Sequence, residues 1–129
     1  EKVKQYISIL DIALVNLKKS DLFKTVIPSK IFENAGMQIP VLLGVEGEAK
    51  EIIDSYHAGI SFEPENETDF IKGIDKLLND TEFYRKCKDG CACLANDFDR
   101  KKLAQKMYRV LLTCMAIRKN RYGRMFKQN

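Results

Sequence analysis

Three short apolar runs, each followed by a helical pattern, constrain the fold of this chain more than any other feature. The runs are DIALVNL at 11–17, IPVLLGV at 39–45 and the weaker GISFEP at 59–64. Short apolar runs bounded by charged residues, glycine or proline are typical of strands buried in a parallel sheet. Because helical patterns alternate with them, we predict an α/β fold with a Rossmann-like parallel sheet covered on both faces.

Helices are expected over 28–37 and 46–57, since Pro28 suits a first helical position and Gly36 a helix end. Asn66 and Asp80 are expected to cap two further helices. The apolar stripe of the first consists of Phe70, Ile71, Ile74, Leu77 and Leu78, and that of the second of Phe83, Cys87, Cys91 and Leu94. A final helix is expected to carry Leu103, Met107, Val110, Leu111, Cys114 and Ile117 on one face.

The number of strands bears on the domain organisation. Three strands make a narrow sheet for such a fold, which usually has about five or six. We therefore expect further strands to precede Glu1, so that residues 1–129 form the second half of a nucleotide-binding domain, with a basic helix and tail over 99–129. No stretch approaches the roughly 20 apolar residues that a membrane span requires.

Charge is unevenly distributed along the chain. The net charge is +4, but no acidic residue follows Asp99, whereas ten basic residues do: Arg100, Lys101, Lys102, Lys106, Arg109, Arg118, Lys119, Arg121, Arg124 and Lys127. The tail is thus +10, and residues 1–99 carry 12 − 18 = −6. The basic run either solvates the last helix or, with Tyr122, Met125 and Phe126, meets an anionic membrane surface. Because no nucleic-acid-binding signature is present, DNA and RNA are not expected as partners.

Cysteine and histidine do not form a metal-binding pattern. Cys87, Cys91, Cys93 and Cys114 lie among helix-forming residues, and His57 is the only histidine. Cys87 and Cys91 fall on the apolar face of a predicted helix, which argues against a zinc site. We expect reduced thiols in a cytosolic protein, no bound metal or cofactor, and a helix-end role for His57.

The loop between Leu17 and Pro28 is the best candidate for binding a ligand. In open α/β sheets, ligands bind beyond the carboxyl ends of the strands, where loops lead into helices. The amides of Ser29 and Lys30, the Ser29 hydroxyl and the Lys30 ammonium together suit a diphosphate. Glu33 lies four residues after Ser29 on the same helical face, where its carboxylate can accept the hydroxyls of a ribose.

These residues also carry a family resemblance. TVIPSKIFENAG, followed by IPVLLGV, GEAKEII, AGISFEPENETDF and KLLND, resembles the carboxyl-terminal domain of the large group 1 family (family 4) of retaining, two-domain GT-B type glycosyltransferases. The likeness runs from Ile9 to Leu111. It is most specific from Phe23 to Val45, where PSK followed by FE is similar to enzymes that build surface polysaccharides or lipid-linked oligosaccharides.

The resemblance implies roles for individual residues. Glu33 falls on the second of two family glutamates, which holds the nucleotide ribose, and Thr25 stands where the family has the first. Pro28 and Ser29 occupy the turn that meets the diphosphate. For Lys30, a phosphate or uracil contact competes with a solvated surface position. In the family, the loop of Gly47 and Glu48 faces the donor sugar, although a capping role competes equally.

The resemblance further implies transfer of a sugar from a nucleotide donor, expected to be UDP-linked, to a glycan or lipid-linked acceptor with retention and without a metal. The catalytic residues are not identified, and the acceptor is expected to bind an amino-terminal domain with which the last helix makes contact. The fragment alone should be inactive. The expected location is cytoplasmic, at the inner face of the membrane. The alternative is a non-catalytic nucleotide-binding or regulatory module, which Thr25 keeps open.

Overall fold

The computed structural model describes residues 2–125 and divides the chain into two compact units, 1–96 and 97–129. Phe126 and Lys127, which belong to the basic tail, lie outside the described residues, as do the side chains of Tyr122 and Met125.

The first unit contains the predicted parallel sheet. Its strands are β1 (Ala13–Asn16), β2 (Val41–Gly44) and β3 (Gly59–Ser61), in the spatial order β1-β2-β3. Ala13 pairs with Val41, and Val41 with Gly59, so the carboxyl ends of all three strands meet at one edge. The strands are shorter than the apolar runs, although the amides of Leu17 and Phe62 extend the pairing by donating to the carbonyls of Gly44 and Leu43.

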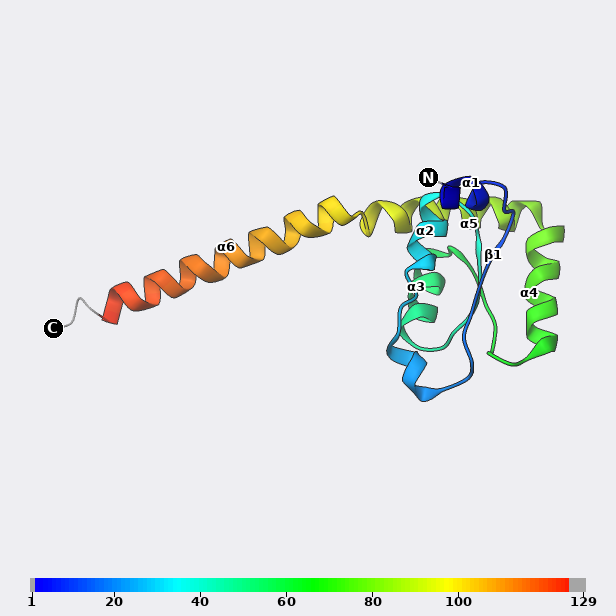
Figure 1. The fold of residues 1–129 in the computed structure, drawn as a ribbon, viewed down its shortest axis with the longest axis horizontal. Helices are drawn as coiled ribbons and strands as arrows, with labels where there is room; N and C mark the ends of the chain where they lie inside the picture. The colour runs from blue at the N-terminus through cyan, green and yellow to red at the C-terminus, as the bar shows by residue number, and fades with distance from the viewer. Residues whose placement is uncertain (1, 126–129) are drawn as a thin grey trace. The chain divides into compact units, whose positions relative to one another are not determined.

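Helices cover both faces of this sheet, as predicted. In chain order they are α1 (Lys2–Ile7), α2 (Lys30–Gly36), α3 (Glu48–Tyr56), α4 (Glu67–Asn79) and α5 (Thr81–Asp97). Figure 1 shows α2 and α3 on one side of the strands and α4 on the other. The α/β prediction with a Rossmann-like parallel sheet is therefore confirmed.

The core is centred on β2, whose four residues are all buried. Leu42 packs in a cluster with Phe62, Leu77 and Cys87. Since side chains alternate along a strand, Val41 and Leu43 point to the opposite face, that of α2 and α3. Burying each such aliphatic side chain contributes about 1.5–3 kcal/mol, so the central strand stabilises both layers.

Helix α4 confirms its predicted cap but only part of its predicted stripe. The Asn66 side chain accepts the Asp69 amide at 3.1 Å, as expected for a cap. Leu77 is buried, and Phe70 and Ile74 pack against the core, but the side chains of Ile71 and Leu78 are 50% and 62% exposed. The prediction was wrong for these two because each lies about 100° further round the helix than Phe70 or Leu77 and so turns away from the sheet.

Helix α5 closes the amino edge of the sheet. Asp80 caps it, as predicted, by accepting the Phe83 amide at 2.9 Å. The Tyr84 hydroxyl donates to the Asp11 carbonyl at 2.8 Å, just before β1. The Cys91 thiol lies 3.4 Å from the carbonyl oxygen of Ile39 and 3.2 Å from that of Ala58, just before β2 and β3. With its amino edge occupied by α5, the sheet has its carboxyl edge left for a site.

The second unit consists mainly of α6 (Arg100–Met125). Asp99 caps it by accepting the Lys102 amide at 3.0 Å. Every side chain described between Arg100 and Arg118 is exposed, including the apolar set predicted to share one face. Within residues 2–125, no helix is both long and apolar enough to cross a membrane.

Candidate functional site

The segment between β1 and α2 lies at the carboxyl edge and folds into a short 3-10 helix, η1 (Asp21–Thr25), which the sequence pattern did not reveal. Ser20 caps η1, and its side chain accepts the Leu22 amide at 3.4 Å. Thr25 ends it, and its exposed hydroxyl lies 3.5 Å from the Leu22 carbonyl oxygen, to which it donates. The Thr25 side chain therefore bonds within its own turn.

The start of α2 differs slightly from the prediction. The helix begins at Lys30 rather than at Pro28, although the carbonyl of Pro28 already accepts the Ile31 amide at 3.1 Å. The Ser29 carbonyl accepts the amides of Phe32 and Glu33. The amides of Ser29 and Lys30 thus lie ahead of the first helical hydrogen bond, as amides at a helix start do.

Ser29 and Glu33 come together on this first turn. The Ser29 hydroxyl donates to the Glu33 carboxylate at 3.3 Å, and both side chains are exposed. The bond uses one carboxylate oxygen, so the other remains available to accept hydroxyl groups. The neighbouring Lys30 side chain is exposed, and its carbonyl accepts the side-chain amide of Asn34 at 2.8 Å.

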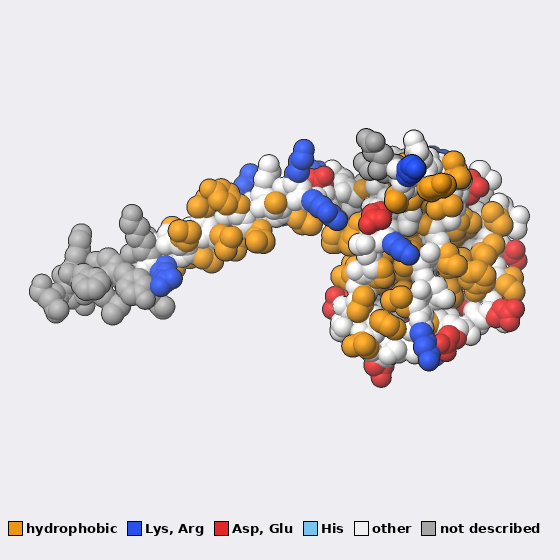
Figure 2. All heavy atoms as spheres, viewed as in Figure 1, with side chains coloured by type: hydrophobic (Ala, Val, Ile, Leu, Met, Phe, Trp, Pro, Cys, Tyr) orange, Lys and Arg blue, Asp and Glu red, His pale blue; other side chains and the backbone are white. Residues whose placement is uncertain are grey.

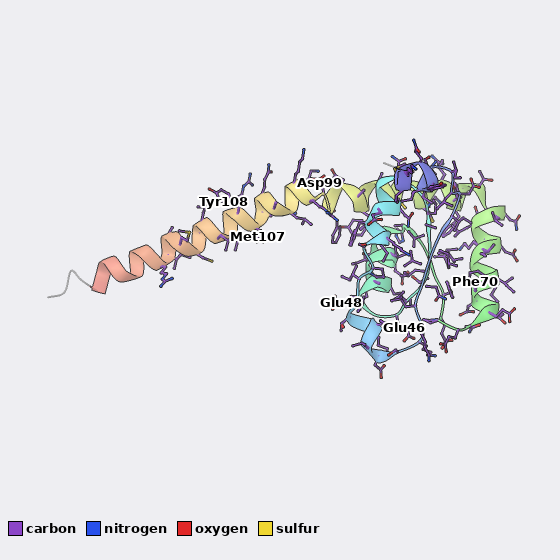
Figure 3. All side chains as sticks on the ribbon, in the orientation of Figure 1. Glu46, Glu48, Phe70, Asp99, Met107 and Tyr108 are labelled. Atoms are coloured by element: carbon purple, nitrogen blue, oxygen red, sulfur yellow. The ribbon has the colours of Figure 1, made fainter. Side chains whose placement is uncertain are left out.

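Gly47 and Glu48 belong to a second group, at the start of α3. Gly47 has φ +74°, a backbone angle that residues with a side chain rarely adopt. A Cβ atom at this position would collide with the Lys24 carbonyl oxygen. The loop after β2 is therefore packed directly against η1, next to Thr25. Glu48 is the exposed first residue of α3 and lies close to Glu46 (Figure 3). Among the described residues, no hydrogen bond joins this group to Ser29 and Glu33.

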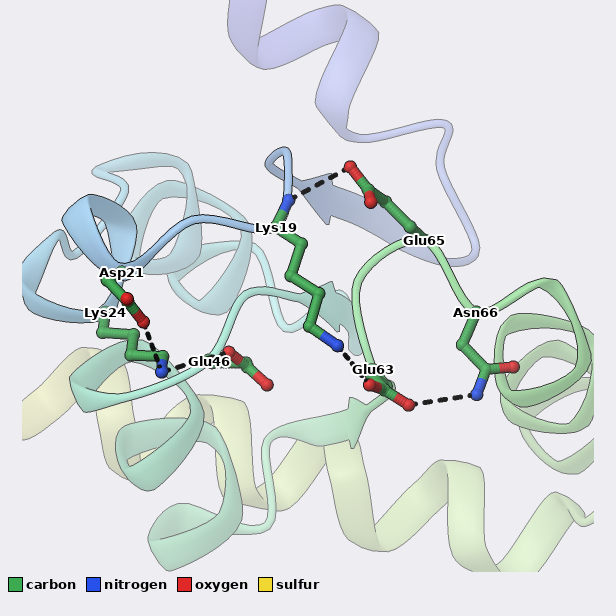
Figure 4. A network of polar contacts seen from close by, with 7 residues as sticks. All are labelled: Lys19, Asp21, Lys24, Glu46, Glu63, Glu65 and Asn66. Atoms are coloured by element: carbon green, nitrogen blue, oxygen red, sulfur yellow. Dashed lines mark hydrogen bonds and ion pairs between the residues drawn. The ribbon is translucent and has the colours of Figure 1, made fainter.

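Charged side chains that the sequence interpretation did not select lie on η1 and on the neighbouring loops (Figure 4). Lys24 contacts Asp21 at 2.7 Å and Glu46 at 3.8 Å. The Lys19 ammonium pairs with the Glu63 carboxylate, and its amide donates to Glu65 at 3.3 Å. The available signal was position: these residues lie at or after the carboxyl ends of the three apolar runs.

These ion pairs shift the pKa values of the paired groups. The hydrogen bond from Lys19, followed by that from Asn66, lowers the pKa of Glu63, and the bond to Glu63 raises the pKa of Lys19. The bond to Asp21 likewise raises the pKa of Lys24. Both lysines are therefore held charged by carboxylates of the chain itself.

A hollow of about 270 Å³ lies beside this network, at the side of the sheet where β1 and α4 approach. Most of the surface that lines the hollow is apolar. The lining residues are Leu14, Asn16, Phe62, Glu65, Asn66, Glu67 and Phe70. The rings of Phe62 and Phe70 meet edge to face, with centroids 5.3 Å apart. None of the residues predicted to bind a nucleotide sugar lines this hollow.

Cys87, Cys91 and His57 lie away from the carboxyl edge. Cys87 and Cys91 are buried in α5, and burial raises their pKa values to about 11 and about 12, so both thiols are neutral. His57 is exposed and ends α3 in the left-handed conformation. In the part of the chain that the structure describes, no three histidine, cysteine or acidic residues form a group able to hold a metal ion.

Comparison with known proteins identifies the family. The family model of glycosyl transferases group 1 matches residues 1–90. Searches of curated proteins and of solved structures found no match. The matched segment is more than half of the chain and contains all three strands, η1 and the start of α2. The chain therefore belongs to the group 1 glycosyl transferases.

Proposed function

We propose that this chain is the donor-binding domain of a retaining, two-domain glycosyltransferase. In this proposal it binds a UDP-linked sugar at the start of α2, and the sugar passes to a glycan or lipid-linked acceptor at the inner face of the membrane. The acceptor and the catalytic base belong to an amino-terminal domain. Family membership supports glycosyl transfer in general.

The observation that carries the proposal is the hydrogen bond between Ser29 and Glu33 on the first turn of α2. It holds an exposed carboxylate one helical turn, about 5.4 Å, beyond the free amides of the helix start. A diphosphate accepts hydrogen bonds and a ribose donates them, and the two are consecutive parts of a nucleotide. In our proposal the Ser29 and Lys30 amides receive the diphosphate, and Glu33 receives the ribose hydroxyls.

The remaining candidates have roles around the reacting centre. The acceptor hydroxyl attacks the anomeric carbon, the bond from that carbon to the diphosphate oxygen breaks, and the hydroxyl proton passes to a base. Lys30 and the positive end of α2 stabilise the charge that develops on the departing diphosphate, so no metal is needed. The loop of Gly47 and Glu48 contacts the sugar, and Pro28 shapes the turn that meets the phosphates.

Titration calorimetry with UDP tests the ribose role of Glu33. Losing a charged hydrogen-bonding partner costs about 1.5–3 kcal/mol, so Glu33→Ala should weaken UDP binding roughly ten- to hundredfold. Glu82→Ala is the matched control, because Glu82 is also an exposed helical glutamate with a partner one turn away, Lys86 at 2.8 Å. Equal affinities for the two variants would refute the ribose role, and no UDP binding by the chain joined to its amino-terminal domain would refute the whole proposal.

A non-catalytic nucleotide-binding or regulatory module is the second candidate. Thr25 favours it, because its hydroxyl bonds back to Leu22 and supplies no carboxylate where the family has its first glutamate. The two candidates separate when the chain is joined to its amino-terminal domain and offered UDP-sugars. Release of UDP supports the transferase, whereas UDP binding without any turnover supports the module.

A further inference from the structure

Glu46, in the loop after β2, carries a half-buried carboxylate that none of the described residues hydrogen-bonds. Its side chain is 36% exposed, compared with 47% for Glu63 and 94% for Asp21. Asp21 and Glu63 each accept a hydrogen bond from a lysine, whereas Glu46 has a longer ion pair with Lys24, at 3.8 Å. A carboxylate that is partly removed from water needs donors to replace the water, so Glu46 is suited to accept hydrogen bonds from a ligand.

The Lys24 ammonium lies beside this carboxylate as a hydrogen-bond donor. It uses only one of its donors for Asp21, at 2.7 Å, and keeps the others for a further group. Figure 4 shows the Glu46 carboxylate between the side chains of Lys24 and Lys19. Figure 2 shows acidic and basic side chains together at the lower end of the first unit, where the blue turn of η1 lies in Figure 1. Because a carboxylate only accepts and an ammonium only donates, the pair suits hydroxyl groups, which do both.

The loop of Glu46 lies on the sugar side of the proposed donor site. In a nucleotide sugar the ribose and the sugar are attached to opposite ends of the diphosphate, so the sugar points away from Glu33 and ahead of the start of α2. That is where the chain arrives from η1, which ends three residues before Pro28, at most about 11 Å of chain away. At the end of η1, the Lys24 carbonyl meets Gly47 so closely that no Cβ atom fits between them. The loop after β2 therefore stands beside the place that the sugar would occupy.

Given the proposed binding of UDP at the start of α2, we propose that Glu46 and Lys24 determine sugar specificity by binding two neighbouring hydroxyls of the donor sugar. The Glu46 carboxylate accepts from one hydroxyl, and the Lys24 ammonium donates to the other. Thr25 carries no carboxylate, and its hydroxyl donates to the Leu22 carbonyl, so the acid of this pair comes from the neighbouring loop. The substrate class is a UDP-linked sugar with two adjacent free hydroxyls.

Calorimetry that compares UDP with UDP-sugars tests the role of Glu46. The chain joined to its amino-terminal domain is titrated with UDP and with UDP-glucose, UDP-galactose and UDP-N-acetylglucosamine, and the UDP-sugar that binds most tightly is kept. Glu46→Ala should weaken binding of that UDP-sugar about tenfold or more and change the affinity for UDP less than about twofold. Glu51→Ala is the matched control, because Glu51 is an exposed acid in the first turn of α3, and it should change neither affinity.

Two further variants separate contact with the sugar from support of the loop. Glu46→Gln keeps an acceptor oxygen but loses the ion pair with Lys24, so it should weaken the UDP-sugar less than Glu46→Ala does. Lys24→Met removes the donors and should also weaken the UDP-sugar more than UDP. The urea midpoint of each variant checks that a loss of binding does not come from unfolding.

The outcomes distinguish this role from the proposed function on which it rests. If Glu46→Ala weakened UDP and the UDP-sugar equally, or changed neither affinity, Glu46 would not bind the sugar, while UDP binding at α2 would stand. If the unaltered protein bound no UDP, the proposed function itself would be wrong.

Discussion

The two edges of the sheet are built from different chemistry. At the amino edge, the neutral hydroxyl of Tyr84 and the neutral thiol of Cys91 donate to backbone carbonyls that precede the strands. At the carboxyl edge, exposed ion pairs such as Lys19 with Glu63 and Lys24 with Glu46 join the loops that follow the strands. One edge is buried beneath α5, whereas the other consists of charged groups in contact with water.

The difference between the two edges links the amino edge to the stability of the fold and the carboxyl edge to ligand binding. Buried packing and hydrogen bonds to carbonyls resist unfolding, because breaking them leaves cavities or unsatisfied polar groups. Exposed ion pairs contribute little to stability, because water and salt screen them. We therefore expect substitutions at the amino edge to lower stability and substitutions at the carboxyl edge to change ligand binding.

The largest expected effect is at the amino edge. Leu94 in α5 is completely buried, so Leu94→Ala should lower the free energy of unfolding by about 2–5 kcal/mol. Leu78→Ala is the matched control on α4, where the side chain is 62% exposed, and it should change the value by less than about 0.5 kcal/mol. Urea denaturation monitored by circular dichroism measures both. Similar values for the two would mean that α5 does not seal this edge.

Alkaline pH should also weaken the amino edge. Burial raises the folded-state pKa of Cys87 from 9.0 to about 11 and that of Cys91 to about 12. A group whose pKa is raised by folding contributes its full stabilisation at pH values below its ordinary pKa. This contribution is lost as the pH rises toward the pKa of the folded state. Between pH 9 and the folded values, each thiol should therefore reduce the free energy of unfolding by about 1.4 kcal/mol per pH unit.

Urea denaturation at a series of alkaline pH values measures that slope. Cys91→Ala should make the slope shallower by the contribution of one proton, whereas Leu94→Ala should lower stability and leave the slope unchanged. Tyr84 contributes in the same direction at higher pH, because burial raises the pKa of its hydroxyl above 10. A free energy of unfolding that is constant across this range would show that the thiols ionise equally in both states.

At the carboxyl edge, Gly47 is the position where a stability effect is expected. Gly47→Ala places a Cβ atom on the Lys24 carbonyl oxygen at a strained φ, and should cost about 1–3 kcal/mol. It should also weaken UDP binding, since η1 and the loop after β2 must shift. Gly36→Ala is the control: apart from its chain neighbours and its own helix backbone, no atom lies within 4 Å of the added Cβ, so stability should stay constant or rise by up to about 1 kcal/mol. Equal effects of the two would show that the loops are not packed together.

Most of the fold could be predicted from the sequence, because apolar periodicity records burial. The runs around Val15, Leu42 and Ile60 became the three strands, and the caps at Asn66 and Asp80 formed as expected. The η1 turn was missed because five residues with mixed polarity give no periodic signal. Ile71 and Leu78 were misplaced because hydropathy alone does not show where a helix face stops touching the sheet.

The candidate site was less predictable than the fold. The spacing of Ser29 and Glu33 was sufficient to place both on one turn, because neighbours four apart meet on a helix. Spacing could not place Lys24 beside Gly47, because that contact joins two loops more than twenty residues apart. Lys19 and Glu63 are even further apart in the sequence, and only the parallel strand order brings them together.

The smallest expected effects on stability come from removing one side-chain contact at each edge. Tyr84→Phe removes the hydroxyl bond to the Asp11 carbonyl and should cost about 0.5–1.5 kcal/mol. Lys19→Gln removes the ion pair with Glu63, in which both side chains are 47% exposed, and should leave the urea midpoint unchanged. If Lys19→Gln destabilised the chain as much as Tyr84→Phe does, the carboxyl edge would also be a structural edge. Its charges would then hold the loops in place rather than leave them free to adapt to a ligand.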